Sequence, residues 1–386
     1  MKRKRRWMAG VVLLALAVFW LLLSRLVPGM AQWHSRSIYR LTAGVLARFW
    51  GLFPFSAAEI CLYILLALFF FTLIKGLFRA VRKRNYKEEG VKWLSGWFLT
   101  AAVLFFLYVI NCGVNYQRDS FSVQEGFITE GYSDEELARV CLWLTDEING
   151  RSDLVERDEK KEMGAGEHVQ EEAAAAMEAL GERYPSLKGY YPRPKKLIFS
   201  SLLSWQNLTG VYSPFTVEAN YNGDITDYNI PFTLCHELAH LRGFMQEEEA
   251  NFIAFLGCVN AKSTEFQYSG YLSAWIYAMN ELNDRDVQRW SQIRRQLLAQ
   301  ADLDVQANSA FWQQYEGKVS GWSEKINDAY LKANGQEDGV ESYNRMVELV
   351  VTYYHMEHAG MQKPLEFFGQ VILTRCQRNG ILYVVT

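Results

Sequence analysis

Two histidines with a glutamate beside the first form the strongest chemical signal in the chain. In the stretch PFTLCHELAHLRGF, His236 and His240 are four residues apart and Glu237 follows the first. On an α-helix this spacing puts both imidazoles on one face. There they can supply two ligands to zinc, while Glu237 accepts a proton from water at the metal. The chain has 6 histidines in all, so two in this arrangement favour a zinc site over a helix that merely packs its histidines.

The third ligand is expected among the glutamates that follow. A continuous helix would place Glu247 about 10 Å along its axis from His240, which is too far to share a metal. Gly243 is therefore expected to end the first helix, and a second helix should begin near Glu247. Gln246 stands where the pattern HExxHxxGxxH has its third histidine, which argues against that pattern.

The acidic stretch EEEAN offers competing ligands. We predict Glu247 as the third ligand, because its register with Asn251 matches zinc peptidases that take a glutamate from the next helix. Asn251 is then expected to orient a histidine or the glutamate from outside the ligand set. Glu249 stays open as the alternative ligand, or as an ion-pair partner of Arg242, and Glu248 is expected to be a solvated charge. A helix dipole also favours acids in a first turn, but that does not explain the register.

A site that acts on a carbonyl group needs a further donor to stabilise the oxyanion. We expect Tyr343, in the stretch ESYNRMVELV, to supply it, with Arg345 or His355 as alternatives. His355 and His358 are three residues apart and could bind metal, but near a helix end we interpret them as a solvated face.

Three apolar runs precede this region and predict a membrane anchor in residues 1–113. The runs cover about 7–27, 58–76 and 93–113, and each is near the roughly 20 residues that cross a bilayer core. None has a charge in its central part. We therefore predict three transmembrane helices, followed by an external domain in residues 114–386.

The basic residues predict the orientation of these helices. KRKRR precedes the first run, and a lysine- and arginine-rich segment, Lys75–Lys92, joins the second to the third. Because cytoplasmic flanks are enriched in such residues, the N-terminus is expected in the cytoplasm and the domain outside it, in a multi-pass protein of the cell membrane. The first run could instead be a signal peptide, but LVPGMAQWH offers no cleavage site of small residues.

The external domain reads as mostly helical with a small β-sheet. Ser133 and Glu136 form a capping box that begins a helix, and Val, Tyr, Phe and Thr between 195 and 222 indicate a pair of short strands. Asn229 can cap the helix that carries the histidines, with Pro231 in its first turn. Later helices are expected near 247–261, 265–282, 286–301, 305–334 and 341–357.

Composition excludes several other functions. A formal net charge of −3 argues against nucleic acid as a partner. The three runs contain no buried ionisable residue of the kind that marks ion paths in transporters. Cys235 and Cys258 lie in apolar helical contexts, so we expect free buried thiols there.

Several stretches together resemble a known family. NYQR, GVYSPFTVEANYN, CHELAHLRGF, EEEANFIAF and SYNRMVELV are similar to an uncharacterised bacterial family of membrane proteins, classed only as a domain of unknown function and regarded as zincin-like from its HExxH. The resemblance covers nearly the whole chain. It implies a mainly α fold, with three N-terminal transmembrane helices and a mostly helical zincin-like external domain. A looser similarity extends to gluzincin metallopeptidases, although the connection between the two site helices is unusually short here.

These features predict a membrane-anchored zinc metallopeptidase with Zn²⁺ as cofactor, a peptide or protein as substrate and the lipid bilayer as partner. Zinc would activate water, and Glu237 would act as general base. The alternative is a catalytically inactive zincin-fold sensor or scaffold in the membrane. The complete set of two histidines and two glutamates favours the enzyme.

Overall fold

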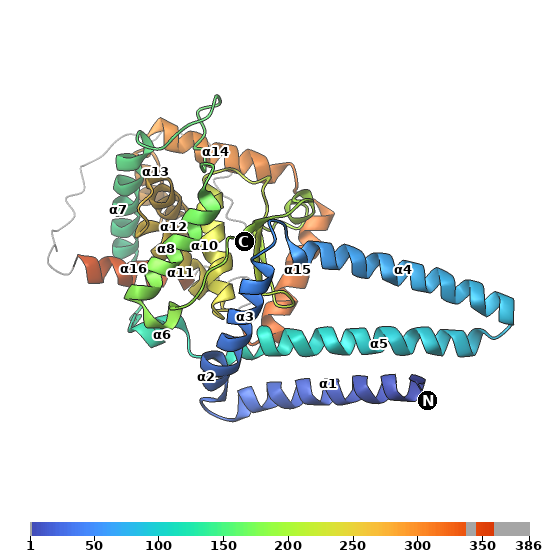
Figure 1. Ribbon diagram of the computed structural model, residues 1–386. Helices are drawn as coiled ribbons and strands as arrows, with labels where there is room; N and C mark the ends of the chain where they lie inside the picture. The colour runs from blue at the N-terminus through green and yellow to red at the C-terminus, as the bar shows by residue number, and fades with distance from the viewer. Residues whose placement is uncertain (1, 337–344, 359–386) are drawn as a thin grey trace.

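The computed structural model describes residues 2–336 and 345–358, which leaves Tyr343 and Cys376 outside the described residues. The fold is mainly helical with one small sheet, as the sequence predicts. In Figure 1 a compact helical domain lies to one side, and three long helices leave it together.

The three long helices are α1 (Lys2–Leu26), α4 (Ala57–Lys83) and α5 (Tyr86–Asn111). Each is long and apolar enough to cross a membrane, which indicates a membrane protein. The side chains of Ser56 and Asn85 cap α4 and α5 by accepting backbone N–H bonds. The predicted spans are confirmed as helices, and α4 and α5 extend further than their apolar runs.

The segment between the first two spans packs onto the domain. It forms α2 (Met30–His34), a π-helical turn at Ser35–Tyr39 and α3 (Arg40–Trp50). Tyr39 is fully buried, and its hydroxyl donates to the carbonyl of Leu241, 2.9 Å away, at the end of the helix that carries the histidines. This segment therefore supports the domain as well as linking two spans.

The domain is built from helices of varied length. They are α6 (Phe121–Glu125), α7 (Asp134–Ser152), α8 (Val169–Arg183), α9 (Ser201–Ser204), α10 (Asn229–Leu241), α11 (Glu247–Val259), α12 (Thr264–Arg285), α13 (Val287–Arg294), α14 (Ala299–Gln313), α15 (Lys318–Ala333) and α16 (Arg345–Glu357). Short 3₁₀ turns lie at Gly113–Gln117 and Pro185–Leu187. The core lies where α7, α8, α10, α11 and α12 pack together, and α10 and α11 are buried along nearly their whole lengths.

Several local predictions can be compared with these bounds. The capping box of Ser133 and Glu136 is confirmed. The single helix expected over 305–334 is wrong, because the chain breaks near Gly317 into α14 and α15. Asn229 is the first residue of α10 rather than its cap, and its amide donates to Thr226 and Asn308. Cys235 and Cys258 are free and buried, as predicted.

The sheet has three strands, β1 (Lys195–Lys196), β2 (Gly210–Ser213) and β3 (Glu218–Tyr221), in the order β1-β3-β2. β3 runs parallel to β1 and antiparallel to β2, with Val211 opposite Asn220. β2 is therefore an edge strand, and both β2 and β3 lie against α10. Glu218 of β3 forms a buried ion pair with Lys195 and accepts the backbone N–H of Ala58, 2.8 Å away, which fixes the sheet to the start of α4.

Candidate metal site

The site is built on two helices joined by a tight turn at Gly243. After α10 ends, the N–H of Gly243 donates to the carbonyl of His240 (2.8 Å) and that of Phe244 to Ala239 (3.2 Å), the bond pattern of a Schellman cap. Gly243 has φ +89°, and a Cβ there would lie 2.8 Å from the ring of Tyr39. Only glycine fits this position without strain, so the turn that reverses the chain depends on it.

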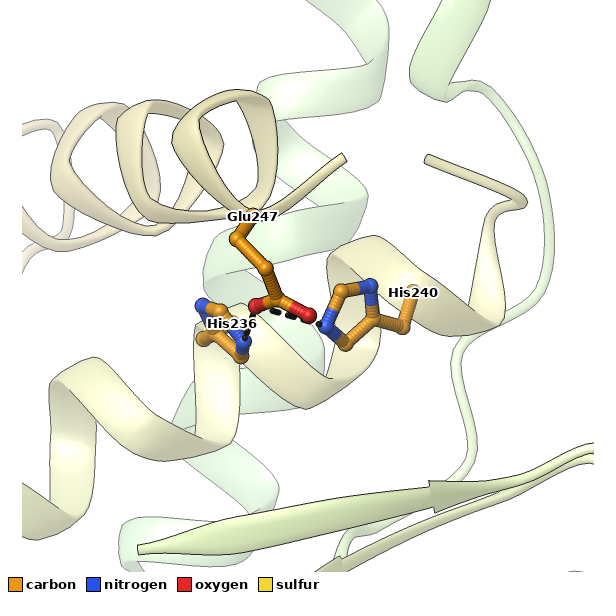
Figure 2. A group of neighbouring side chains, drawn as sticks. All are labelled: His236, His240 and Glu247. Carbon is orange, nitrogen blue, oxygen red and sulfur yellow. Dashed lines mark ion pairs between the residues drawn. The ribbon is translucent and has the colours of Figure 1, made fainter. Parts of the chain in front are cut away.

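Three side chains from the two helices converge on one point. His236 and His240 lie one turn apart on α10, and Glu247 is the first residue of α11 (Figure 2). The Nε2 atoms of His236 and His240 lie 3.3 and 3.5 Å from Oε2 of Glu247. One donor atom from each residue lies within 4.8 Å of the others. This buried group could hold a metal ion.

Hydrogen bonds on the far side of each ring fix both imidazoles. Nδ1 of His236 lies 2.7 Å from Oδ1 of Asn251, and Nδ1 of His240 lies 2.7 Å from the carbonyl of Phe244. Because both partners are acceptors, each Nδ1 carries a proton, so a neutral ring would present the lone pair of its Nε2 to the shared point. Asn251 lies one turn after Glu247 on α11, and Nδ2 of Asn251 donates to the hydroxyl of Tyr277, 3.2 Å away.

The pKa values of the three converging side chains are shifted in different directions. Burial lowers the pKa of His236, and the neighbouring His240 acts in the same direction. Burial also acts to lower the pKa of His240, but the Glu247 carboxylate outweighs it and raises the pKa to about 9. Although burial acts to raise the pKa of Glu247, the imidazoles hold it well below its ordinary value. Without a metal, the group is therefore a protonated His240 paired with an ionised Glu247.

Glu237 lies beside this group with part of its carboxylate unengaged. Its Oε2 is buried and has no hydrogen-bond partner among the described residues, and burial raises the pKa of Glu237 to about 8. A Cβ on Gly210, the first residue of β2, would lie 2.5 Å from Oε1 of Glu237. The edge strand can approach the carboxylate this closely only because position 210 is glycine.

The other two glutamates of the triplet face elsewhere. Glu249 accepts hydrogen bonds from the backbone N–H and the hydroxyl of Ser122, at 2.9 and 2.6 Å, and so holds α6 rather than facing the histidines. Glu248 is buried and accepts from the amide of Gln336, 2.7 Å away. The expectation of a solvated Glu248 is therefore wrong, because α11 packs against α16 and because Gln336, which follows α15, bonds to the carboxylate.

A cavity of about 210 Å³ opens over the group. Its walls come from the end of α5, from β2 and from α15, and include Cys112, Tyr116, Gly210, Tyr212, Asn327 and Tyr330 as well as the three converging side chains and Glu237. Cys112, Tyr116, Asn327 and Tyr330 could not be assigned to the site from the sequence, since nothing in their local patterns links them to the HELAH stretch.

Of the donors expected to stabilise an oxyanion, the two among the described residues, Arg345 and His355, do not line this cavity. Arg345 lies 4.0 Å from Glu248, and Nε2 of His355 lies 3.4 Å from Glu136 on α7. His358 bonds to the carbonyl of Tyr354 on its own helix. Tyr343 lies outside the described residues. The phenols that line the cavity are those of Tyr116, Tyr212 and Tyr330.

The comparisons with known proteins give one match. A family model described as a protein of unknown function (DUF3810) matches residues 34–351, which covers most of the chain and includes the whole candidate site. No curated protein and no solved structure matches the chain. The zincin resemblance therefore depends on the site itself.

Proposed function

Because the chain belongs to the DUF3810 family, whose function is unknown, we propose its function from its site: a membrane-anchored zinc metallopeptidase. The observation that carries the proposal is the convergence of His236, His240 and Glu247 next to the unengaged carboxylate of Glu237. In this proposal, three metal ligands and a base lie on two adjoining helices, beside the edge of a sheet.

The donor set fits zinc. Zinc binds imidazole nitrogen and carboxylate oxygen at about 2.0–2.2 Å in tetrahedral geometry, so two such ligand atoms lie roughly 3.3–3.5 Å apart. The two Nε2 atoms lie 3.3 and 3.5 Å from Oε2 of Glu247, which agrees with that separation. Three protein ligands are the number found in catalytic zinc sites, which keep one position open.

When bound, zinc would supply the Lewis acid that activates water and polarises a peptide carbonyl. Glu237 would accept the proton of that water and pass it to the amine that leaves. Burial favours this role, because a carboxylate in a dry cleft has a pKa close to neutral and so can both take and give the proton. Tyr330 would donate a hydrogen bond to the oxyanion. It lines the cavity, and its hydroxyl accepts from that of Tyr116, 3.4 Å away, and lies 3.6 Å from Sγ of Cys112.

The edge strand β2 would hold the substrate in an extended conformation. The N–H of Asn222 donates to the carbonyl of Thr209, 2.8 Å away. Hydrogen-bonded positions alternate along an antiparallel pair, so Thr209 and Val211 bond to β3, and Gly210 between them does not. The alternation then turns the N–H and C=O groups of Gly210 and Tyr212 toward the free edge, beside Glu237. An extended peptide can pair with that edge through its backbone.

The arrangement of charge supports an extracytoplasmic domain. Arg6, Lys75, Arg79 and Lys92 gather around one pocket at the end of the spans away from the domain, and basic flanks favour the cytoplasm. Alkaline phosphatase fused to the C-terminus should then be active in cells, because it folds only outside the cytoplasm. Inactive phosphatase with a fluorescent cytoplasmic reporter at the same site would overturn this orientation.

The function is tested on the full-length chain in lipid nanodiscs, because the spans and the domain share contacts. Wild type should contain one zinc and cleave members of a peptide library. Glu237→Gln should keep zinc and lose cleavage, and Glu247→Ala should lose zinc. The exposed Glu178→Gln on α8 is the matched control and should change neither. Zinc without cleavage in wild type would favour the scaffold or sensor, and absence of zinc would refute the site.

A further inference from the structure

The segment from 198 to 205 lies beside the first turn of α4, where we expect the boundary of the hydrocarbon core. The apolar part of α4 ends at Lys75, and a hydrocarbon core of about 30 Å takes roughly 20 helical residues. Counted back from Lys75, the core reaches the first turn of α4. There the Glu59 carboxylate accepts the backbone N–H groups of Ile198 and Phe199, at 2.8 and 3.0 Å, and the ring of Phe199 lies 5.7 Å from that of Tyr63.

The end of α15 lies at the same depth beside α5. The last charge before the apolar part of α5 is Lys92, so roughly 20 residues bring the boundary of the core to the end of that helix. In its last turn, the Tyr108 hydroxyl donates to Asn334, 2.7 Å away, and its ring lies 6.3 Å from that of Tyr330. Arg25 of α1 also donates to the carbonyl of Ala333, 3.0 Å away.

α15 connects these two places. Tyr315, just before its start, stacks edge-on with Trp205 at 5.3 Å, and Trp205 follows α9 in the same segment as Phe199. Figure 1 shows α15 between the points where α4 and α5 meet the domain. Since both ends of α15 are tied to elements at membrane depth, the helix lies along the membrane plane.

Both elements expose large apolar side chains, and α15 also exposes charged residues such as Glu324 and Lys325. On α15, Val319, Trp322 and Ile326 fall at positions i, i+3 and i+7, which share one face, and Trp322 is 73% exposed. The segment from 198 to 205 exposes Ile198, Phe199, Leu202 and Trp205. Helices with an apolar face of this kind lie in the bilayer interface, where tryptophan is enriched.

The cavity over the candidate metal site opens between α15 and residues 208–214, which include β2 and follow the segment 198–205 in the chain. Asn327 and Tyr330 of α15 form one wall, and Leu208, Val211 and Pro214 form the other. Pro214 in turn accepts a hydrogen bond from Asn111 at the end of α5, 2.8 Å away. A substrate polypeptide that enters the cavity between these walls would therefore pass along the membrane surface.

We propose that α15 and the segment 198–205 lie in the interfacial layer of the bilayer, and that the cleft takes its substrate from there. The substrate class is a membrane-anchored polypeptide, cut in the stretch next to its anchor. This inference depends on the proposed peptidase activity for its substrate, but not for its membrane contact.

Membrane contact is measured without any assay of activity. Full-length protein carrying Trp322→Cys, in a background with Cys61→Ser and Cys376→Ser, is labelled with nitrobenzoxadiazole and reconstituted in vesicles of phosphatidylcholine and phosphatidylglycerol. The label should emit at shorter wavelength and lose emission when doxyl-labelled lipid is added. The matched control is Val287→Cys, exposed on α13, which packs on α7 and α12 and should show neither change. Equal emission and quenching at the two positions would overturn the proposal.

Substrate class is measured with one peptide library presented in two ways. The library is fused to a single apolar span in the same vesicles or supplied free in solution, and the cuts are mapped by mass spectrometry. Wild type should cut the anchored form faster and close to its span. The double variant Trp322→Asp with Ile326→Asp should lose that preference, whereas Val287→Asp should retain it.

The outcomes separate the two proposals. Equal cutting of anchored and free peptides overturns the substrate class while the peptidase stands. Failure to cut either form by a zinc-loaded wild type refutes the peptidase and the substrate class together, and the quenching result then still decides the membrane contact.

Discussion

Asn251 and His236 meet across two helices, with Oδ1 of the amide 2.7 Å from Nδ1 of the ring. The amide cannot turn over, because its Nδ2 donates to the hydroxyl of Tyr277 on α12. A bond of this kind fixes the tautomer of a metal-binding histidine and raises its basicity. The relationship gives the first prediction.

Asn251→Leu should weaken zinc binding about 10- to 100-fold, the usual effect of losing such a partner. Asn251→Asp keeps an acceptor toward His236 and should restore most of the affinity. Competition with a chromophoric chelator measures both values. Asn260→Leu, at the far end of α11, is the matched control. Equal affinities for the Leu and Asp variants would show that the amide only fills space.

Glu249→Ala should leave zinc content unchanged and destabilise the protein by about 1–3 kcal/mol, because the backbone N–H of Ser122 would lose its acceptor in a buried place. Thermal unfolding in detergent tests the loss of stability, and metal analysis of the same samples tests the zinc content. Glu247→Ala, in contrast, is expected to lose zinc. Loss of zinc from the Glu249 variant would restore Glu249 as the rival ligand.

Zinc binding should expel a proton. The pKa of His240 is raised to about 9 in the metal-free group, so His240 is protonated at neutral pH and must lose that proton to bind the ion. The apparent affinity should therefore rise about tenfold per pH unit up to pH ~9 and level off above it. Calorimetry in buffers with different ionisation heats counts the proton directly. An affinity that does not change between pH ~7 and ~8.5 would contradict the paired state of His240 and Glu247.

Gly210→Ala should impair catalysis while zinc stays bound. The added Cβ would lie 2.5 Å from Oε1 of Glu237, so either the base or the edge strand must move. We expect roughly a 10- to 100-fold fall in kcat, since small displacements of a positioned group have effects of this size. Gly150→Ala on α7, where nothing lies within 4 Å, serves as control. Full activity in the Gly210 variant would argue that Glu237 is not the base.

Tyr330→Phe should lower kcat about 10²- to 10³-fold with little change in KM, as for other lost oxyanion donors. Zinc content should be unaffected, because the phenol is not in the ligand group. Tyr354→Phe on α16 is the control, and its kcat should equal that of wild type. A change confined to KM would assign Tyr330 to substrate binding instead.

The sequence by itself determined the parts that depend on local chemistry. Helical periodicity placed His236 and His240 on one face, with Glu237 next to the first, and hydropathy identified the three spans. Gly243 and the register of Glu247 with Asn251 predicted a turn between two helices. Such a turn could be predicted because a glycine that ends one helix and the acidic residues that begin the next are local features of the sequence.

Only the tertiary structure decided what depends on residues far apart in the chain. Glu248 and Glu249 look alike in sequence, yet one bonds to Gln336 and the other to Ser122, partners that local pattern cannot identify. In the same way, the break at Gly317 frees α15 to lie across the ends of the spans. Burial and long-range contacts are properties of the packed chain, so only the tertiary structure decided which residues form the walls of the cleft.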